Sequence, residues 1–260
     1  MDPGSLQKTS HKYIFSYWDH PNPTEFVKLC KSTWEKWNPD YKVVLLNKKT
    51  VHKWIVIPKL HFIQKSKQVF ADVVRVLLIE KYGGYWVDST VIAYCKFDSL
   101  LRLDKNLYNW DFFGYFMPGF TTDPRYPVIE NWFFGAKPNS PFITMWKNVF
   151  LSLDKCKDST EYYKNMQKQG VDLQNIKYLD YLSMHIAAQH VLQKSNQTFN
   201  MHTLKATSGP FRYLKDAKWD SAKAINMLIN NRCYKKTLVK IRGIERKIIE
   251  DNNIKLESLL

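Results

Sequence analysis

One stretch in the first half of the chain limits the choice of fold more than any other feature. Residues 67–82 place apolar side chains at helical spacing, and Gly83 and Gly84 follow directly. Glycine commonly ends a helix because it adopts positive φ without steric cost. Residues 85–87 are apolar and lead into the polar triplet 88–90. A helix, a glycine turn and a buried strand in this order predict an α/β fold.

The same alternation continues through most of the chain. Apolar residues 13–17 and 42–46 predict two short strands, joined by a helix that begins after Pro23 and ends near Lys36. A strand, a helix and a strand in this order favour parallel pairing. Further strands are expected at 112–116 and 131–136, and further helices at 141–153 and 178–192. The sequence therefore predicts a mainly parallel central sheet flanked by helices.

The two ends of the chain differ from its centre. Residues 1–7 resemble a remnant of cloning and are left out of the fold. Residues 8–234 show neither an internal repeat nor an interdomain linker, which predicts a single domain. Residues 235–260 carry a charged helical pattern and are expected to form a peripheral C-terminal appendage.

Composition narrows the classes of function. The net charge is +15, yet only seven of the basic residues are arginine. Because arginine is the preferred reader of base edges, this balance argues against a sequence-specific DNA-binding protein. The four cysteines lack C-x-x-C spacing, and the chain shows no signal peptide and no apolar run of transmembrane length. We therefore expect reduced thiols and a cytoplasmic protein, with peripheral membrane association left open.

Asp72 and Arg75 are the first residues that point to chemistry. They are three positions apart, so they share one face of the predicted helix. Alone, such a pair is most often a surface ion pair of small energetic value. Here the helix leads into a strand that ends at Asp88, and open α/β sheets bind ligands beyond the carboxyl ends of their strands. A carboxylate there can bind sugar hydroxyls, or a divalent cation beside a diphosphate.

Residues 70–90 as a block resemble the signature of glycosyltransferase family 32, and most closely its capsular polysaccharide synthesis branch. That signature joins an S/A-Asp-x-x-Arg helix, a Tyr-Gly-Gly turn and an Asp-x-Asp or Asp-x-Thr end. The order, the residue types and the spacing all match, and weaker similarity extends over residues 11–215. The resemblance implies a Rossmann-like fold of the GT-A type and a glycosyltransferase that uses sugar nucleotides.

The resemblance also implies roles for individual residues. Trp18 would stack against the nucleotide base, and Asp72 and Arg75 would reach hydroxyls of the transferred sugar and the ribose. Asp88 would contact the donor and help to hold Mn²⁺ or Mg²⁺. Thr90 stands where many relatives carry a second Asp as metal ligand. Because a hydroxyl is a poorer ligand than a carboxylate, we expect a cation that binds weakly alone and is assisted by the nucleotide.

Further candidates lie around and beyond this motif. Glu130 and Asp180 are candidates for acid–base catalysis near the acceptor, with surface or capping carboxylates as the alternative. His185 is expected to be a structural histidine. The remaining donor-binding candidates are Tyr17, Gly83, Gly84, Ser208 and Gly209.

The function implied by the resemblance is transfer of a sugar from a nucleoside diphosphate donor to a glycan hydroxyl. A UDP-hexose or UDP-pentose is the expected donor, and surface polysaccharide or glycoprotein glycan is the expected product. Retention of anomeric configuration is the default of the family, and the stereochemistry stays open. Two other classes also stay open. One is a non-catalytic module that binds nucleotide sugars or glycans, which Thr90 favours. The other is a basic nucleic-acid-binding protein, which the net charge favours.

Overall fold

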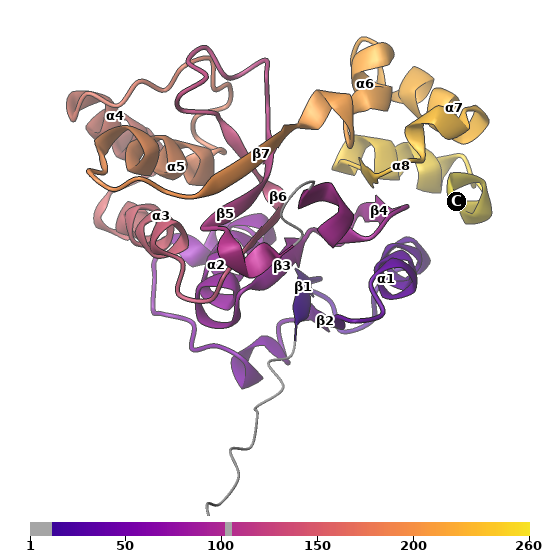
Figure 1. Ribbon diagram of the computed structural model, residues 1–260, viewed down its shortest axis with the longest axis horizontal. Coiled ribbons are helices and arrows are strands. Elements are labelled where there is room, and N and C mark those ends of the chain that lie inside the picture. The colour runs from indigo at the N-terminus through magenta and orange to yellow at the C-terminus, as the bar shows by residue number, and fades with distance from the viewer. Residues whose placement is uncertain (1–11, 102–105) are drawn as a thin grey trace, which may run out of the picture.

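The computed structural model describes residues 12–101 and 106–260, so the expected cloning remnant at 1–7 lies outside the described residues. Within the described residues, six strands form a central sheet in the order β2-β1-β3-β6-β5-β7 (Figure 1). These strands are β1 (Tyr13–Tyr17), β2 (Lys42–Leu46), β3 (Gly84–Val87), β5 (Phe112–Phe116), β6 (Ile129–Ala136) and β7 (Met201–Lys205). A smaller two-stranded sheet pairs β4 (Val91–Ala93) with β8 (Leu238–Lys240).

The central sheet is mainly parallel, as the sequence predicts. β1 pairs in parallel with β2 and β3, and β5 pairs in parallel with β7. β6 lies between β3 and β5 and is antiparallel to both. β6 is therefore the strand that reverses direction, and the other five share one direction. The expected architecture, a mainly parallel sheet flanked by helices, is confirmed.

Helices cover both faces of this sheet (Figure 1). Successive residues of a strand point to opposite faces, and Ile14 and Tyr85 face one apolar core while Phe15 and Trp86 face the other. The first core includes residues of α1 (Glu25–Trp37), α7 (Ser221–Asn230) and α8 (Gly243–Asp251). The second includes residues of α2 (Lys67–Tyr82), α3 (Pro141–Leu151), α4 (Ser159–Lys168) and α5 (Ser183–Lys194).

The turn between α2 and β3 explains the paired glycines. Gly83 ends α2 with φ at 64°, and Gly84 opens β3 with φ at 85°. A β-carbon on Gly84 would lie 2.3 Å from the carbonyl oxygen of Tyr13 in the adjacent strand. Only glycine fits this conformation and this approach. The two glycines thus set the close packing of β3 against β1, at the end of β3 remote from Asp88.

The C-terminal residues 235–260 are built into the molecule. Leu238, Val239 and Ile241 are buried in the same core as α1, and β8 pairs antiparallel with β4. α6 (Arg212–Asp216), α7 and α8 form one group beside β4 and α1 (Figure 1). The segment was expected to be a peripheral appendage. In this segment apolar residues are interleaved with charged ones. The high share of charged residues made the buried strand and the amphipathic helix hard to recognise from the sequence.

Two boundaries differ from the sequence-based expectation. α5 begins at Ser183 and not near residue 178, because Tyr178 has φ at 56° and therefore cannot continue a right-handed helix. The expected helical stretch 235–260 is also not helical from its start, since β8 precedes α8 there. The four cysteines have free thiols. Among the described helices, none has both the length and the apolar character needed to cross a membrane.

Candidate active site

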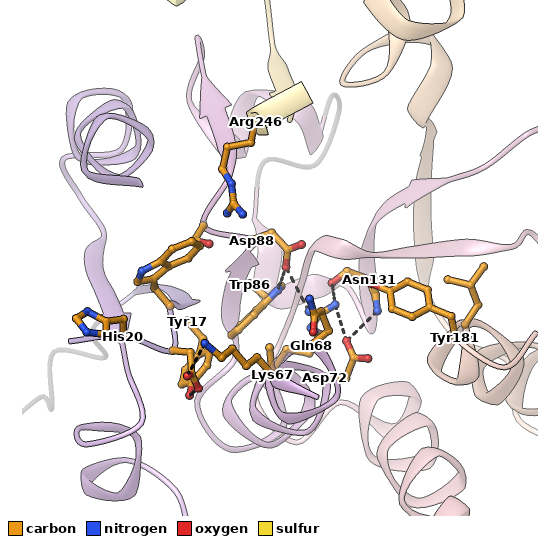
Figure 2. A pocket seen from close by; sticks show the side chains of 16 residues that line it. Tyr17, His20, Lys67, Gln68, Asp72, Trp86, Asp88, Asn131, Tyr181 and Arg246 are labelled. Atoms are coloured by element: carbon orange, nitrogen blue, oxygen red, sulfur yellow. Dashed lines mark hydrogen bonds and ion pairs between the residues drawn. The ribbon is translucent and has the colours of Figure 1, made fainter. Parts of the chain in front are cut away.

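A cavity of about 450 Å³ opens at the carboxyl ends of β1 and β3 (Figure 2). The sequence brings its walls together because β1 and β3 are parallel neighbours, with Phe15 opposite Trp86. The residues that follow these strands therefore emerge at the same edge of the sheet, as ligand-binding residues do in open α/β sheets. The polar and aromatic residues that line the cavity include Tyr17, Trp18, Asp19, Lys67, Asp72, Arg75, Asp88, Asn131, Tyr181 and Arg246.

Arg75 links the two carboxylates of the motif. Its Nη1 lies 3.0 Å from Oδ1 of Asp72, and its Nη2 lies 3.3 Å from Oδ1 of Asp88. Nη1 also donates a hydrogen bond to the carbonyl oxygen of Asn131, and the guanidinium stacks over the ring of Trp86. The Arg75 side chain is only 6% exposed. The pair is therefore no surface ion pair, and the predicted convergence of Asp72, Arg75 and Asp88 is present in the structure.

Asp72 is a carboxylate with an unusual proton affinity. Burial raises its pKa to about 6, against the opposing attraction of Arg75. The side-chain amide of Asn131 donates a hydrogen bond of 3.1 Å to Oδ1 of Asp72. Asp72 thus changes charge near neutral pH while it stays fixed between an arginine and an amide donor (Figure 2).

Asp88 is held by donors on both of its oxygens. Trp86 Nε1 donates to Oδ1 at 3.0 Å, on the same oxygen that faces Arg75. Lys240 Nζ donates to Oδ2 at 2.7 Å. Burial would raise the pKa of Asp88, but Lys240 and Arg75 outweigh burial and hold the pKa below its ordinary value. Asp88 is therefore ionised across the physiological pH range.

Lys240 also contacts the second predicted metal ligand. Its Nζ donates to Oγ1 of Thr90 at 3.1 Å, while the Thr90 hydroxyl donates to the carbonyl oxygen of Ile241 at 2.7 Å. A divalent metal ion prefers charged oxygen ligands and is repelled by a nearby cation. Here the ammonium of Lys240 already contacts both Oδ2 of Asp88 and Oγ1 of Thr90, and Thr90 offers no charge. These residues do not fit the metal site that the resemblance implies. Over residues 12–101 and 106–260, no three His, Cys, Asp or Glu side chains are grouped as metal ligands.

Trp18 is the residue that the resemblance expects to stack against the nucleotide base. It follows β1, is half-buried and lines the cavity. The guanidinium of Arg246 lies over its ring at 5.3 Å from the centroid. Tyr17 also lines the cavity, but its hydroxyl donates to Asp19 at 2.8 Å and its ring packs against Phe70. Tyr17 therefore shapes the wall that carries Trp18.

The structure does not bring the other predicted site residues to this cavity. Glu130 is buried, and its Oε2 lies 3.7 Å from Nε2 of the equally buried His185. Asp180 is exposed and accepts a hydrogen bond from Thr160. The remaining residues also lie elsewhere: Ser208 and Gly209 line a different cavity, and Gly83 and Gly84 lie at the opposite end of β3.

Several cavity residues had no signal in the sequence. Arg246 reaches the cavity from α8, and Tyr181 and Leu182 reach it from the turn before α5 (Figure 2). Lys240 lies behind Asp88, in a segment with no motif. The one available signal was a single lysine among apolar neighbours, in the run Leu238-Val239-Lys240-Ile241. A charge within an apolar strand needs a partner, and the sequence does not say which partner it has.

The cavity combines the groups that a sugar nucleotide requires. It offers an aromatic face at Trp18, carboxylates at Asp72 and Asp88, and cations in the exposed Lys67 and the half-buried Arg246. Aromatic rings bind planar bases, carboxylates accept hydrogen bonds from sugar hydroxyls, and cations attract phosphate. The arrangement suits a ligand that has all three parts.

Comparison with known proteins identifies a family. The model of the family described as capsular polysaccharide synthesis protein matches residues 3–242. No curated protein matches the sequence significantly. The similar solved structures include the PaToxG glycosyltransferase, at 16% identity over 96% of this chain and 86% of that chain, with a TM-score of 0.41. They also include the glycosyltransferase GlyE of Streptococcus pneumoniae TIGR4, at 11% identity over 96% of this chain, with a TM-score of 0.46. This chain spans 62% of the length of GlyE.

Proposed function

Because this chain belongs to the capsular polysaccharide synthesis protein family, we propose that it is a glycosyltransferase that uses a nucleoside diphosphate sugar. The donor that we propose is a UDP-hexose or a UDP-pentose. The acceptor is a glycan hydroxyl in the synthesis of surface polysaccharide or of a glycoprotein glycan. The observation that supports this most strongly is the cluster of Asp72, Arg75 and Asp88 beside the half-buried Trp18 in one cavity.

Each part of the donor has a suitable partner in the cavity. The base stacks on Trp18, and the diphosphate lies near Arg246, whose guanidinium is next to that ring. Asp72 and Asp88 accept hydrogen bonds from hydroxyls of the sugar and the ribose. Arg75 is too deeply buried to be a flexible phosphate ligand, since its side chain is 6% exposed. Its role in this proposal is to fix both carboxylates in place.

The reaction exchanges one bond at the anomeric carbon for another. The bond from this carbon to the β-phosphate oxygen breaks, and its electron pair stays on the departing nucleoside diphosphate. The acceptor hydroxyl oxygen forms the new glycosidic bond, and its proton passes to the departing phosphate or to water. The contribution of the protein is to orient the two substrates and to stabilise the charge that develops on the diphosphate.

A ligand screen tests the proposed donor. We expect UDP-glucose, UDP-galactose or UDP-xylose to raise the melting temperature of the purified chain, because a ligand that binds only the folded state stabilises it by mass action. GDP-mannose and single-stranded DNA serve as comparison ligands. A chain that is stabilised by DNA alone, with a steep dependence on salt, would be a nucleic-acid-binding protein instead.

Turnover separates an enzyme from a binding module. Thr90 is the residue that favours a binding module. It stands where many relatives carry a second carboxylate, and its hydroxyl already bonds to Ile241 and Lys240. We expect slow release of UDP from the stabilising donor in the absence of acceptor, measured by chromatography, because bound water replaces the acceptor hydroxyl in some turnovers. A donor that binds but stays intact over days, with or without glycan acceptors, would identify a non-catalytic module.

A further inference from the structure

Lys240 holds an unusual position for a lysine. It is the last residue of β8, and the antiparallel pairing with β4 sets it opposite Val91, next to the end of the 88–90 triplet. Its side chain is 11% exposed. From there its ammonium reaches Oδ2 of Asp88 at 2.7 Å and Oγ1 of Thr90 at 3.1 Å. One positive charge therefore contacts both of the side chains that the resemblance implies as metal ligands.

Folding gains little from a charge in this place. Removing an ammonium from water costs several kcal/mol, and pairing with a carboxylate often does no more than offset that cost. The neighbours Leu238, Val239 and Ile241 are apolar and buried. An unbranched apolar side chain such as methionine would fill the same volume without the cost of desolvation. The ammonium is therefore better explained by what it does for the cavity than by what it does for stability.

A metal ion and this ammonium would compete for the same two oxygens. A Mg²⁺ ion lies about 2.1 Å from its oxygen ligands. An ion held by both Asp88 and Thr90 would therefore lie close to Lys240 Nζ, which is 2.7 Å and 3.1 Å from these oxygens. Moving Lys240 away would leave its charge without a partner in a nearly buried place, which is strongly unfavourable. Repulsion between two cations adds to this cost.

Arg246 supplies a second cation from the same part of the chain. It lies on α8, a few residues after β8, and its guanidinium points into the cavity from the side opposite Lys67 (Figure 2). Its Nε is 3.7 Å from Glu250, a long ion pair that leaves the guanidinium free to meet a ligand. Lys240 behind Asp88 and Arg246 above Trp18 thus set positive charge on two sides of the place where a diphosphate would lie.

We propose that Lys240 takes the place of the divalent cation in this chain, so that Lys240 and Arg246 compensate the charge of the donor diphosphate and no metal ion is required. The proposal rests on the proposed function, since it concerns the donor of that same cavity. Lys240 acts as a fixed positive charge and as a positioning residue for Asp88.

Nucleotide binding with and without metal is the first test. Calorimetric titration with UDP in EDTA, and again in Mn²⁺, should give affinities within about threefold of each other. The Lys240→Met variant should bind UDP at least tenfold more weakly in EDTA, which corresponds to about 1.4 kcal/mol. Lys240→Arg keeps the charge and should recover most of the affinity. A residue with a purely structural role would not make binding depend on charge in this way.

The matched control is Lys147→Met. Lys147 forms a comparable ion pair with Glu80 at 2.6 Å, and the two side chains are 18% and 19% exposed, but Glu80, unlike Asp88, does not line the cavity. The Lys147→Met variant should lower the melting temperature about as much as Lys240→Met does, without changing the affinity for UDP. If Lys240→Met fails to fold, Lys240→Arg, Arg246→Gln and the wild-type comparison of EDTA with Mn²⁺ still decide the matter.

Metal binding without nucleotide is the second test. The electron paramagnetic resonance signal of free Mn²⁺ should be unchanged by the wild-type protein. A double variant that combines Thr90→Asp with Lys240→Met offers two carboxylates and no ammonium, so it should reduce that signal. Wild-type protein that reduces the signal, in a manner that Asp88→Asn abolishes, would overturn the proposal.

The outcomes separate this proposal from the proposed function. UDP binding that requires Mn²⁺ keeps the proposed donor and overturns the role of Lys240. UDP binding in EDTA that Lys240→Met weakens and Lys147→Met does not supports both. Binding of neither UDP nor GDP, with or without Mn²⁺, overturns both.

Discussion

Asp88 faces two cations, because Arg75 contacts its Oδ1 and Lys240 contacts its Oδ2. A carboxylate between two charged partners has a fixed orientation and a fixed ionisation state. Removing it affects both partners, and it leaves Lys240 without a counter-ion in a nearly buried place. At the scale of single residues, Asp88 therefore contributes both to stability and to the site, although it stands at the end of a strand and not within the core.

We predict that Asp88→Asn abolishes sugar transfer and also lowers the free energy of unfolding by about 1–3 kcal/mol, because the lysine charge loses its partner. Transfer is measured as release of UDP, and stability by urea unfolding. The matched control is Glu80→Gln, which removes the partner of Lys147 away from the cavity. That variant should lose stability and keep transfer. An Asp88→Asn protein with normal transfer would refute the site.

Arg75 offers a test of how much its burial matters. If Arg75 made an ordinary surface pair, Arg75→Ala would cost less than about 1 kcal/mol. Because it is buried between Asp72 and Asp88, we predict a loss of about 3 kcal/mol in the free energy of unfolding, together with a loss of transfer of at least tenfold.

The comparison for Arg75 is Arg125→Ala, which removes the exposed pair with Asp123. That variant should leave the unfolding midpoint and the transfer rate unchanged. Arg75→Lys retains the charge but not the forked geometry, so it should recover little of the stability and transfer that Arg75→Ala loses. Equal behaviour of Arg75→Ala and Arg125→Ala would contradict the buried linkage.

The proton on Asp72 makes stability depend on pH. Its pKa rises from 3.8 to about 6 in the folded chain, mainly through burial. Between these values the folded state binds the proton more tightly than the unfolded state, so the contribution of Asp72 to stability falls as pH rises. We predict that the unfolding free energy of wild type, minus that of Asp72→Asn, decreases from pH 4 to pH 6 and levels off above about pH 7. Urea unfolding at a series of pH values measures this difference, and an increase with pH would contradict it.

Elements, and not only residues, position the cavity. α2 carries Asp72 and Arg75, and the glycine turn after it fixes how β3 meets β1. That contact aligns the carboxyl ends of the two strands, where Trp18 and Asp88 emerge. The turn therefore acts on the site from the far end of β3.

We predict that Gly84→Ala lowers the free energy of unfolding by about 1–3 kcal/mol, since it forces a positive φ and a clash with the backbone of Tyr13. Gly119→Ala is the matched control, because a β-carbon there meets nothing within 4 Å and its φ is not positive. The control should keep the wild-type melting temperature or raise it slightly. Melting temperatures measured by circular dichroism compare the two variants. Equal values would contradict the close approach of Gly84 to the backbone of Tyr13.

At the scale of the whole molecule, the C-terminal segment completes the cavity. β8 and α8 carry Lys240 and Arg246, and the same segment buries Val239 and Ile249 in the core. Cavity and core thus share the same elements, so this segment has a part in both folding and the site. The pairing of β4 with β8 is the contact through which it reaches the motif.

Local sequence determined the α/β class, the mainly parallel sheet and the meeting of Asp72, Arg75 and Asp88. These features follow from short-range rules: helical spacing sets one face, glycine ends the helix, and parallel strands bring their carboxyl ends to one edge. Trp18 was expected from the family resemblance alone, and in the structure it follows β1 at that same edge. The same rules could not place Glu130, Asp180 or Ser208, whose neighbours in the fold come from distant parts of the chain.

Only the tertiary structure decided what compensates the charge of Asp88. Lys240 is 152 positions away in the sequence, and it reaches Asp88 because β8 pairs with β4 in a single register. That register depends on which side chains of both strands are buried, and burial is a property of the folded chain and not of either segment alone. The sequence therefore left a metal ion as the expected partner of Asp88 and Thr90, whereas the fold places an ammonium there.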